Sequence, residues 1–152
     1  MATQATGRVV RDDQGLELLI ERRLVAPADD VWRWLTVPAR LAKWMPAPKS
    51  LTTTVLEPNE RVRFEGVAGD QPWRIDLSIA EVGGTTTVFA SHRLSGARHA
   101  GDVGPMWEFI LDRLVAAHSS HAAPSMDEYF PSQRPYFERL AMDGDPIGWP
   151  TT

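Results

Sequence analysis

Hydrophobic and polar residues alternate along several stretches of this chain, and a period of two predicts β-strands. In the clearest early stretch, residues 16–25, one parity carries Leu18, Ile20, Arg22 and Leu24. Other strands are predicted at residues 8–11, 51–56, 61–66, 73–82 and 85–94. The turn-rich tetrad at residues 12–15 is expected to join the first two strands in a hairpin.

A pair of glycines predicts how the last two strands pair. Gly83 and Gly84 can both take positive φ, so they favour a two-residue hairpin turn. Counting back along both strands from this turn places Ile75 opposite His92. His92 is thereby predicted on the apolar face of the sheet.

A loop and a charge pair predict the register of the middle strands. The four residues 57–60 are interpreted as a loop that places Leu56 opposite Arg61. In the register favoured for the next pair of strands, Arg63 lies opposite Asp76, and opposite charges across a strand pair are stabilising.

One face of the predicted sheet is apolar and needs a cover. After a glycine-rich loop at residues 95–104, large apolar residues recur at helical spacing and predict a long amphipathic helix at residues 104–118. Short helices are predicted at residues 29–35 and 38–45, the second ended by Pro46 and Pro48. Near the C-terminus, Pro131 and Pro135 are expected to divide two short helical pieces.

Composition removes several classes of function. The chain has 152 residues and a net charge of −4, which argues against nucleic acid as a partner. It has no cysteine, so disulfides and thiolate metal sites are excluded. No apolar run approaches the roughly 20 residues of a membrane span, and the N-terminus has no signal-peptide pattern, so a cytoplasmic protein is expected. No phosphate loop or dinucleotide motif occurs, and no cofactor is expected.

Three segments carry a resemblance to a known family: ERRLVAPADDVWRWLTVPARLAKWM, WEFILDRLVAAH and MDEYFPSQRPYFERL. Together with the order of elements, they resemble the START-like helix-grip (SRPBCC) superfamily, and most closely the branch related to activators of the heat-shock-protein-ninety ATPase. The resemblance implies an α+β fold in which a curved antiparallel sheet wraps around a long C-terminal helix, with two short helices after the first strand. A middle hairpin of that branch is missing around residues 67–72, which predicts a narrower sheet and a more open cavity.

The order of the predicted elements also suggests how the chain is divided. Residues 1–15 are interpreted as an arm or short strand, residues 16–122 as the helix-grip domain, and residues 123–152 as a helical tail on that domain. Four tail aromatics are expected to pack within the chain or, alternatively, to form a homodimer or other protein contact. They are Tyr129, Phe130, Tyr136 and Phe137.

The predicted ligand site is the space between the sheet and the long helix. Pockets are mostly apolar with a few polar anchors, and inward-facing aromatic and apolar residues fit that description. The predicted lining is Trp44, Thr53, Phe64, Trp73, Ile75, Leu77, His92, Trp107 and Leu111. The same residues could equally form plain core.

His92 and Arg22 are the candidate catalytic residues. His92 could exchange a proton with a ligand, or be a core histidine satisfied by a neighbour. Arg22 could meet a ligand anion, or pair with a carboxylate of the long helix. His118 and His121 have metal-compatible spacing, but no nearby acidic residue or cysteine completes a site, so no metal is expected. His99, in the glycine-rich loop, is expected to be solvated.

Three functions remain open on this evidence. The first is binding of a small apolar or aromatic ligand without catalysis. The second is an enzyme of the aromatase/cyclase kind that uses His92 and Arg22. The third is a chaperone-associated protein-interaction module, as the family resemblance suggests.

Overall fold

The computed structural model describes residues 4–45, 51–68 and 71–143. The strands are β1 (Arg8–Asp12), β2 (Gly15–Leu24), β3 (Thr52–Glu57), β4 (Arg61–Ala68), β5 (Gln71–Val82) and β6 (Thr85–Leu94). The helices are α1 (Ala28–Thr36), α2 (Pro38–Leu41), α3 (Ala97–His118) and α4 (Phe130–Asp143), with a 3₁₀ turn, η1, at Met126–Glu128.

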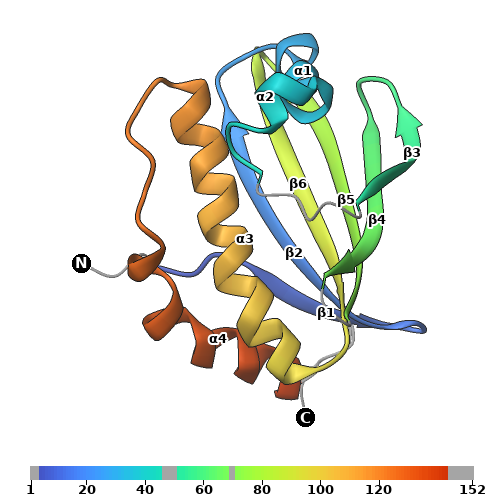
Figure 1. Cartoon of the computed structure of the whole chain (residues 1–152), viewed down its shortest axis with the longest axis vertical. Coiled ribbons are helices and arrows are strands. Elements are labelled where there is room, and N and C mark those ends of the chain that lie inside the picture. The colour runs from blue at the N-terminus through green and yellow to red at the C-terminus, as the bar shows by residue number, and fades with distance from the viewer. Residues whose placement is uncertain (1–3, 46–50, 69–70, 144–152) are drawn as a thin grey trace.

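The strands of the described ranges form one antiparallel sheet in the order β1-β2-β6-β5-β4-β3. Its inner face packs against α3, mainly through β2, and α4 packs against α3 and β1 (Figure 1). The short helices α1 and α2 lie at the opposite end of the sheet from the junction of β6 with α3 (Figure 1). The predicted α+β class and its order of elements are therefore confirmed.

The predicted hairpins and charge pair are confirmed. Gly83 and Gly84 have φ values of 60° and 84°, and Ile75 lies opposite His92. Arg63 lies opposite Asp76, and its Nε donates to a carboxylate oxygen of Asp76 at 2.8 Å. β1 pairs with β2 as expected, with Asp12 opposite Gly15.

The predicted loop at residues 57–60 is one residue too long. Glu57 pairs with Arg61, which places Leu56 opposite Val62 rather than Arg61. Asn59 adopts a positive φ of 60° and tightens the turn. A bulge at Thr54 then absorbs the extra residue.

Two helices differ in length from the prediction. α2 ends at Leu41 because the backbone hydrogen bonds then switch to i−3 partners and the chain turns to bury Trp44. Pro46 and Pro48 lie outside the described residues. α4 is continuous rather than divided, and Pro135 lies inside it. Pro135 is exposed and removes one backbone hydrogen bond, while the buried side chain of Phe137 packs the same helix onto the core.

The long helix begins seven residues earlier than predicted, so residues 97–103 are helical rather than loop. Glycine is a poor helix former, which made this segment look like a linker. Gly101 and Gly104 instead allow close contact with α4: a Cβ on Gly101 would lie 2.7 Å from Glu138, and one on Gly104 would lie 2.3 Å from Phe137. Packing between helices thus overrides local propensity here.

Around the position of the missing hairpin, the described residues of β4 and β5 pair with each other. β4 and β5 stay paired to the end of their described residues, where Ala68 lies opposite Gln71. No helix in the described ranges is long and apolar enough to cross a membrane.

Candidate functional site

His92 is buried in the core, and one of its ring nitrogens has no partner. The residue is only 1% exposed, and its Nδ1 accepts a hydrogen bond from the indole Nε1 of Trp107 at 2.8 Å. A neutral imidazole that accepts at Nδ1 carries its proton on Nε2. Nε2 is buried and has no hydrogen-bond partner among the described residues. Such an unmade hydrogen bond is costly, and it marks the site as a candidate for function.

Two further rings pack edge-on against His92. The ring centroid of Trp73 lies 5.0 Å away and that of His99 lies 5.4 Å away. His99 was predicted in a loop, and this is wrong, because it lies in the first turn of α3; its side chain is half-buried rather than fully solvated. Its Nδ1 accepts a hydrogen bond from the backbone N–H of Ser95 at 3.0 Å. Three aromatic side chains thus meet at the start of α3.

Burial keeps both histidines neutral. The pKa of His92 is lowered to about 3, mainly because burial disfavours the charged ring and also because His99 is close. Burial likewise lowers the pKa of His99. At neutral pH this end of the core therefore presents uncharged imidazoles.

The lowered pKa of His92 predicts how stability depends on pH. Between about pH 6.5 and pH 3 the unfolded chain binds a proton at this residue that the folded chain does not, so stability falls as the pH falls. This residue alone is expected to contribute a slope of about 1.4 kcal/mol per pH unit near pH 5. Urea unfolding at pH 7, 6 and 5 measures it. His92→Gln should flatten the slope by about that amount.

His121→Gln is the matched control, because His121 is exposed beyond the end of α3. It should leave the pH dependence as it is in the parent protein. If His92→Gln kept the full slope, the buried neutral state of His92 would be contradicted.

The sheet forks beside this cluster. Pairing between β5 and β6 ends at Ile75 and His92, whereas β5 stays paired with β4 and β6 stays paired with β2 beyond that point. Residues 73–74 and 93–94 therefore separate, and a cavity of about 330 Å³ lies at this end of the sheet; we call it the fork cavity. Its lining is Glu65, Gly66, Pro72, Trp73, Arg74, Arg93, Leu94, Ser95 and His99.

The predicted ligand-lining residues are mostly packed in the core. Phe64, Ile75, Leu77, His92, Trp107, Leu111 and Trp44 are all buried there. Thr53 is exposed on β3 and lies outside this core. Trp73 is half-buried and lines the fork cavity. β5 and β6 separate only beyond Ile75 and His92. The fork cavity therefore lies at the edge of the predicted ligand site between the sheet and the long helix, not at its centre.

Arg22 is held by carboxylates rather than left open to a ligand. Its Nη2 lies 2.6 Å from Glu108 and its Nε lies 2.7 Å from Asp112, both on α3. His92 lies opposite Leu18, four residues from Arg22 along β2, which is about 13 Å in a strand. The structure does not bring Arg22 and His92 together, so the enzyme alternative lacks the shared site that it needs.

The two C-terminal histidines also separate. His118 lies in the last turn of α3, and its Nε2 lies 3.0 Å from a carboxylate oxygen of Asp30 on α1. His121 lies beyond the helix and is exposed. Within the described ranges, no group of three potential metal ligands comes together.

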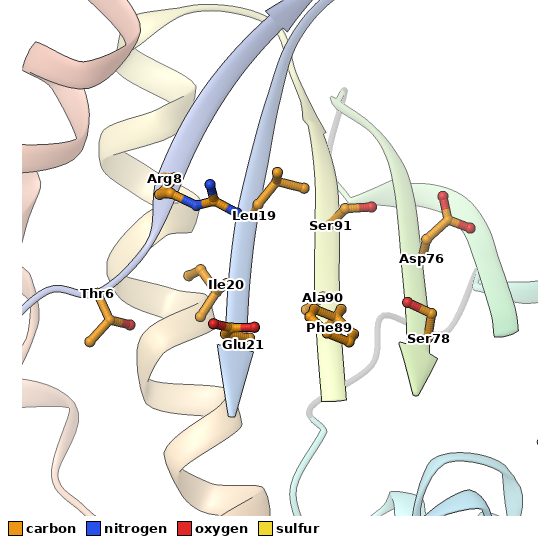
Figure 2. Close-up of a pocket in the computed structure, with 10 residues that line it drawn as sticks. All are labelled: Thr6, Arg8, Leu19, Ile20, Glu21, Asp76, Ser78, Phe89, Ala90 and Ser91. Carbon is orange, nitrogen blue, oxygen red and sulfur yellow. The ribbon is translucent and has the colours of Figure 1, made fainter. Parts of the chain in front are cut away.

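A second cavity, the outer cavity, lies on the opposite face of the sheet. It measures about 230 Å³. Figure 2 shows its lining on β1, β2, β5 and β6 and on the segment before β1, with Phe89 between Glu21 and Ser78. Most of these side chains have the outward parity, whereas Ile20 and Ala90 belong to the core. The register places Ser91 between Leu19 and Asp76 in the adjacent row.

Sequence reasoning missed Arg74 and His99. Arg74 has the outward parity of a solvated strand face, and His99 comes three residues after Gly96, in a segment predicted to be a loop. In the structure Arg74 lies opposite Glu65 on β4. No local signal showed that β5 and β6 separate beside them.

The tail aromatics pack within the chain. Tyr129 and Phe137 are buried, and the Tyr136 hydroxyl donates to the backbone carbonyl of Gly7 at 2.9 Å. Phe130 is half-buried at the start of α4. A role of this tail in a homodimer stays a prediction.

Comparison with known proteins supports the fold. No protein-family model matches the chain, and no curated protein matches it. The crystal structure of CalU16 from Micromonospora echinospora aligns with a TM-score of 0.74 at 23% identity, covering 93% of this chain and 99% of CalU16. A solution structure from Bordetella parapertussis aligns with a TM-score of 0.60 at 17% identity, covering 99% of this chain and 100% of that one.

DynU16, a protein of the dynemicin biosynthetic locus, aligns with a TM-score of 0.60 at 17% identity. The alignment covers 72% of this chain and 50% of DynU16. At these identities the likeness concerns the fold alone. The chain has the α+β helix-grip architecture that its sequence predicts, shared with CalU16 and DynU16.

Proposed function

We propose that the protein binds a small aromatic molecule in the fork cavity. Trp73 and His99 form its aromatic walls, and His92 lies directly behind them. The observation that carries the proposal is the buried Nε2 of His92, which has a proton to donate and no partner among the described residues. A ligand oxygen that reaches it would replace the missing hydrogen bond.

Size and chemistry support the same choice. Ligand pockets usually measure about 300–1,000 Å³, and the fork cavity lies at the lower end of that range at about 330 Å³. It therefore suits a molecule of one or two rings. His92 itself does not line the cavity, so a ligand reaches its Nε2 only if the ring of Trp73 or His99 moves. The outer cavity, at about 230 Å³, is smaller and has no buried orphan group.

Likeness to DynU16 adds a weaker argument. That protein belongs to a biosynthetic locus, which is in keeping with a small-molecule ligand. The chaperone-associated role stays a prediction from the sequence resemblance, and the aromatase/cyclase role loses support because Arg22 is already paired.

Binding of 2-naphthamide, a neutral two-ring probe, tests the proposal. Isothermal titration calorimetry at pH 7.5 should detect a complex with the parent protein. Trp73→Ala should weaken it about tenfold, because stacking on one aromatic wall is lost. Phe89→Ala, in the outer cavity, is the matched control and should change the Kd less than twofold.

Two results would overturn the proposal. One is the absence of binding to the parent protein at millimolar probe. The other is loss of affinity in Phe89→Ala with none in Trp73→Ala, which would place the ligand on the outer face.

A further inference from the structure

Strand alternation divides the fork cavity into an aromatic and a charged part. On β5, Trp73 points to the inner face and Arg74 to the outer face, because successive side chains alternate. On β6, Leu94 points to the inner face and Arg93 to the outer face. Residues of both parities line the cavity, so the inward Trp73 and the outward Arg74 both border it.

Arg74 is the cation of the fork cavity that has no ion pair among the described residues. Its side chain makes no hydrogen bond within the part of the chain that the structure describes, whereas its backbone is paired with β4. Arg93 is already neutralised, because its guanidinium lies 3.1 Å from Asp12 and 3.3 Å from Glu17. An unpaired guanidinium at a cavity wall is an available anion site.

Glu65 also lines the cavity and lies opposite Arg74. Its Oε2 accepts a hydrogen bond from the Thr54 hydroxyl at 2.6 Å. Thr54 lies on β3, on the side of β4 away from β5, so this bond draws the carboxylate away from Arg74. The guanidinium of Arg74 therefore keeps donors available to a ligand, while Glu65 keeps its own negative charge on the opposite strand.

We infer, on the basis of the proposed function, that the ligand is an aromatic carboxylic acid of one or two rings whose carboxylate pairs with Arg74. Its ring lies inside, between Trp73 and His99, and its carboxylate lies on the outer side of the fork. Guanidinium and carboxylate match in planar, two-bonded geometry, which gives both affinity and orientation. The histidines on the inner side are uncharged at neutral pH, so they offer the carboxylate no positive charge there.

Comparison of 2-naphthoate with 2-naphthamide tests this inference, because the two probes differ only in the charge of the terminal group. By calorimetry at pH 7.5 and low salt, the parent protein should bind 2-naphthoate about tenfold more tightly. Arg74→Gln should remove that preference and leave the Kd of 2-naphthamide within twofold. Arg74→Lys should keep part of it, since a point charge lacks the two-bonded geometry. Added salt should weaken 2-naphthoate alone.

Arg8→Gln is the matched control, because it removes the same charge from the outer cavity. It should leave the preference for 2-naphthoate intact. Equal binding of both probes by the parent protein, or an unchanged preference in Arg74→Gln, would overturn the inference while the proposed function stands. Failure of both probes to bind at millimolar concentration would overturn both.

Discussion

Replacing Arg22 with methionine is expected to lower the free energy of unfolding by about 3–5 kcal/mol. The guanidinium bridges Glu108 and Asp112, and Glu108 is fully buried. Methionine fills similar space but leaves the Glu108 carboxylate without its counter-charge. Removing one partner of a buried ion pair strands the other charge in a poor solvent, and this sets the size of the effect.

The stranded carboxylate would keep some support. Glu108 also accepts hydrogen bonds from the Thr6 hydroxyl at 2.6 Å and from the backbone N–H of Gly7 at 2.7 Å. These bonds tie the N-terminal arm to α3, so the loss of Arg22 should also loosen residues 4–7. Hydrogen exchange of the Gly7 amide would report that loosening.

Urea unfolding at pH 7 measures the effect on stability. Arg23→Met is the matched control. Arg23 is the next residue on β2, and its side chain is exposed on the opposite face of the sheet. It should cost less than about 0.5 kcal/mol. Arg22→Met with Glu108→Gln should recover part of the loss, because the second change removes the stranded charge. If Arg22→Met and Arg23→Met lowered the free energy of unfolding equally, the ion pairs of Arg22 with Glu108 and Asp112 would not stabilise the fold.

The second large effect is expected for Gly104→Ala at the contact between α3 and α4. A Cβ there would lie 2.3–2.7 Å from three ring atoms of Phe137, which is fully buried and cannot move aside. Alanine gains about 1 kcal/mol in helix propensity, but overpacking of this kind costs about 1–3 kcal/mol or more. We expect a net loss of about 2 kcal/mol, measured by urea unfolding.

Gly101→Ala provides the comparison one turn away. Its Cβ would meet the side chains of Glu138 and Arg134, which are half-buried and flexible, so they can rotate away. The helix-propensity gain should then leave stability unchanged or slightly raised. Phe137→Leu should restore part of the loss in the Gly104→Ala background. Equal losses of unfolding free energy in Gly101→Ala and Gly104→Ala would show that the contact between Gly104 and Phe137 is not the cause of the destabilisation.

Local features of the sequence were reliable guides to the strands. Gly83 and Gly84 predict their hairpin because few other residues adopt positive φ at no cost. The Arg63–Asp76 pair predicts its register because a shift of either strand by one residue would move that strand's charged side chain to the apolar face. The loop at residues 57–60 was predicted one residue too long. The bulge at Thr54 adds one residue to β3, so the strands pair correctly beyond it although the turn is one residue shorter.

The candidate site was predicted less well. Counting from the hairpin predicted that His92 lies on the apolar face, and it does. Its hydrogen-bond partner Trp107, on α3, is fifteen residues further along the chain and was not predicted. Arg22 was likewise placed correctly by parity, whereas its two carboxylate partners lie some ninety residues further along the chain. Parity predicts which face a side chain takes and says nothing about which distant group meets it.

The sequence by itself determined the α+β class, the hairpins and the inward position of His92, because alternation, helical spacing and turn conformations are properties of neighbouring residues. Only the tertiary structure decided that residues 97–103 are helical, that Arg22 is neutralised and that β5 and β6 separate beside His92. Each of these depends on contacts between segments far apart in the chain. Their free energies arise from packing and charge pairing that no short stretch of sequence contains.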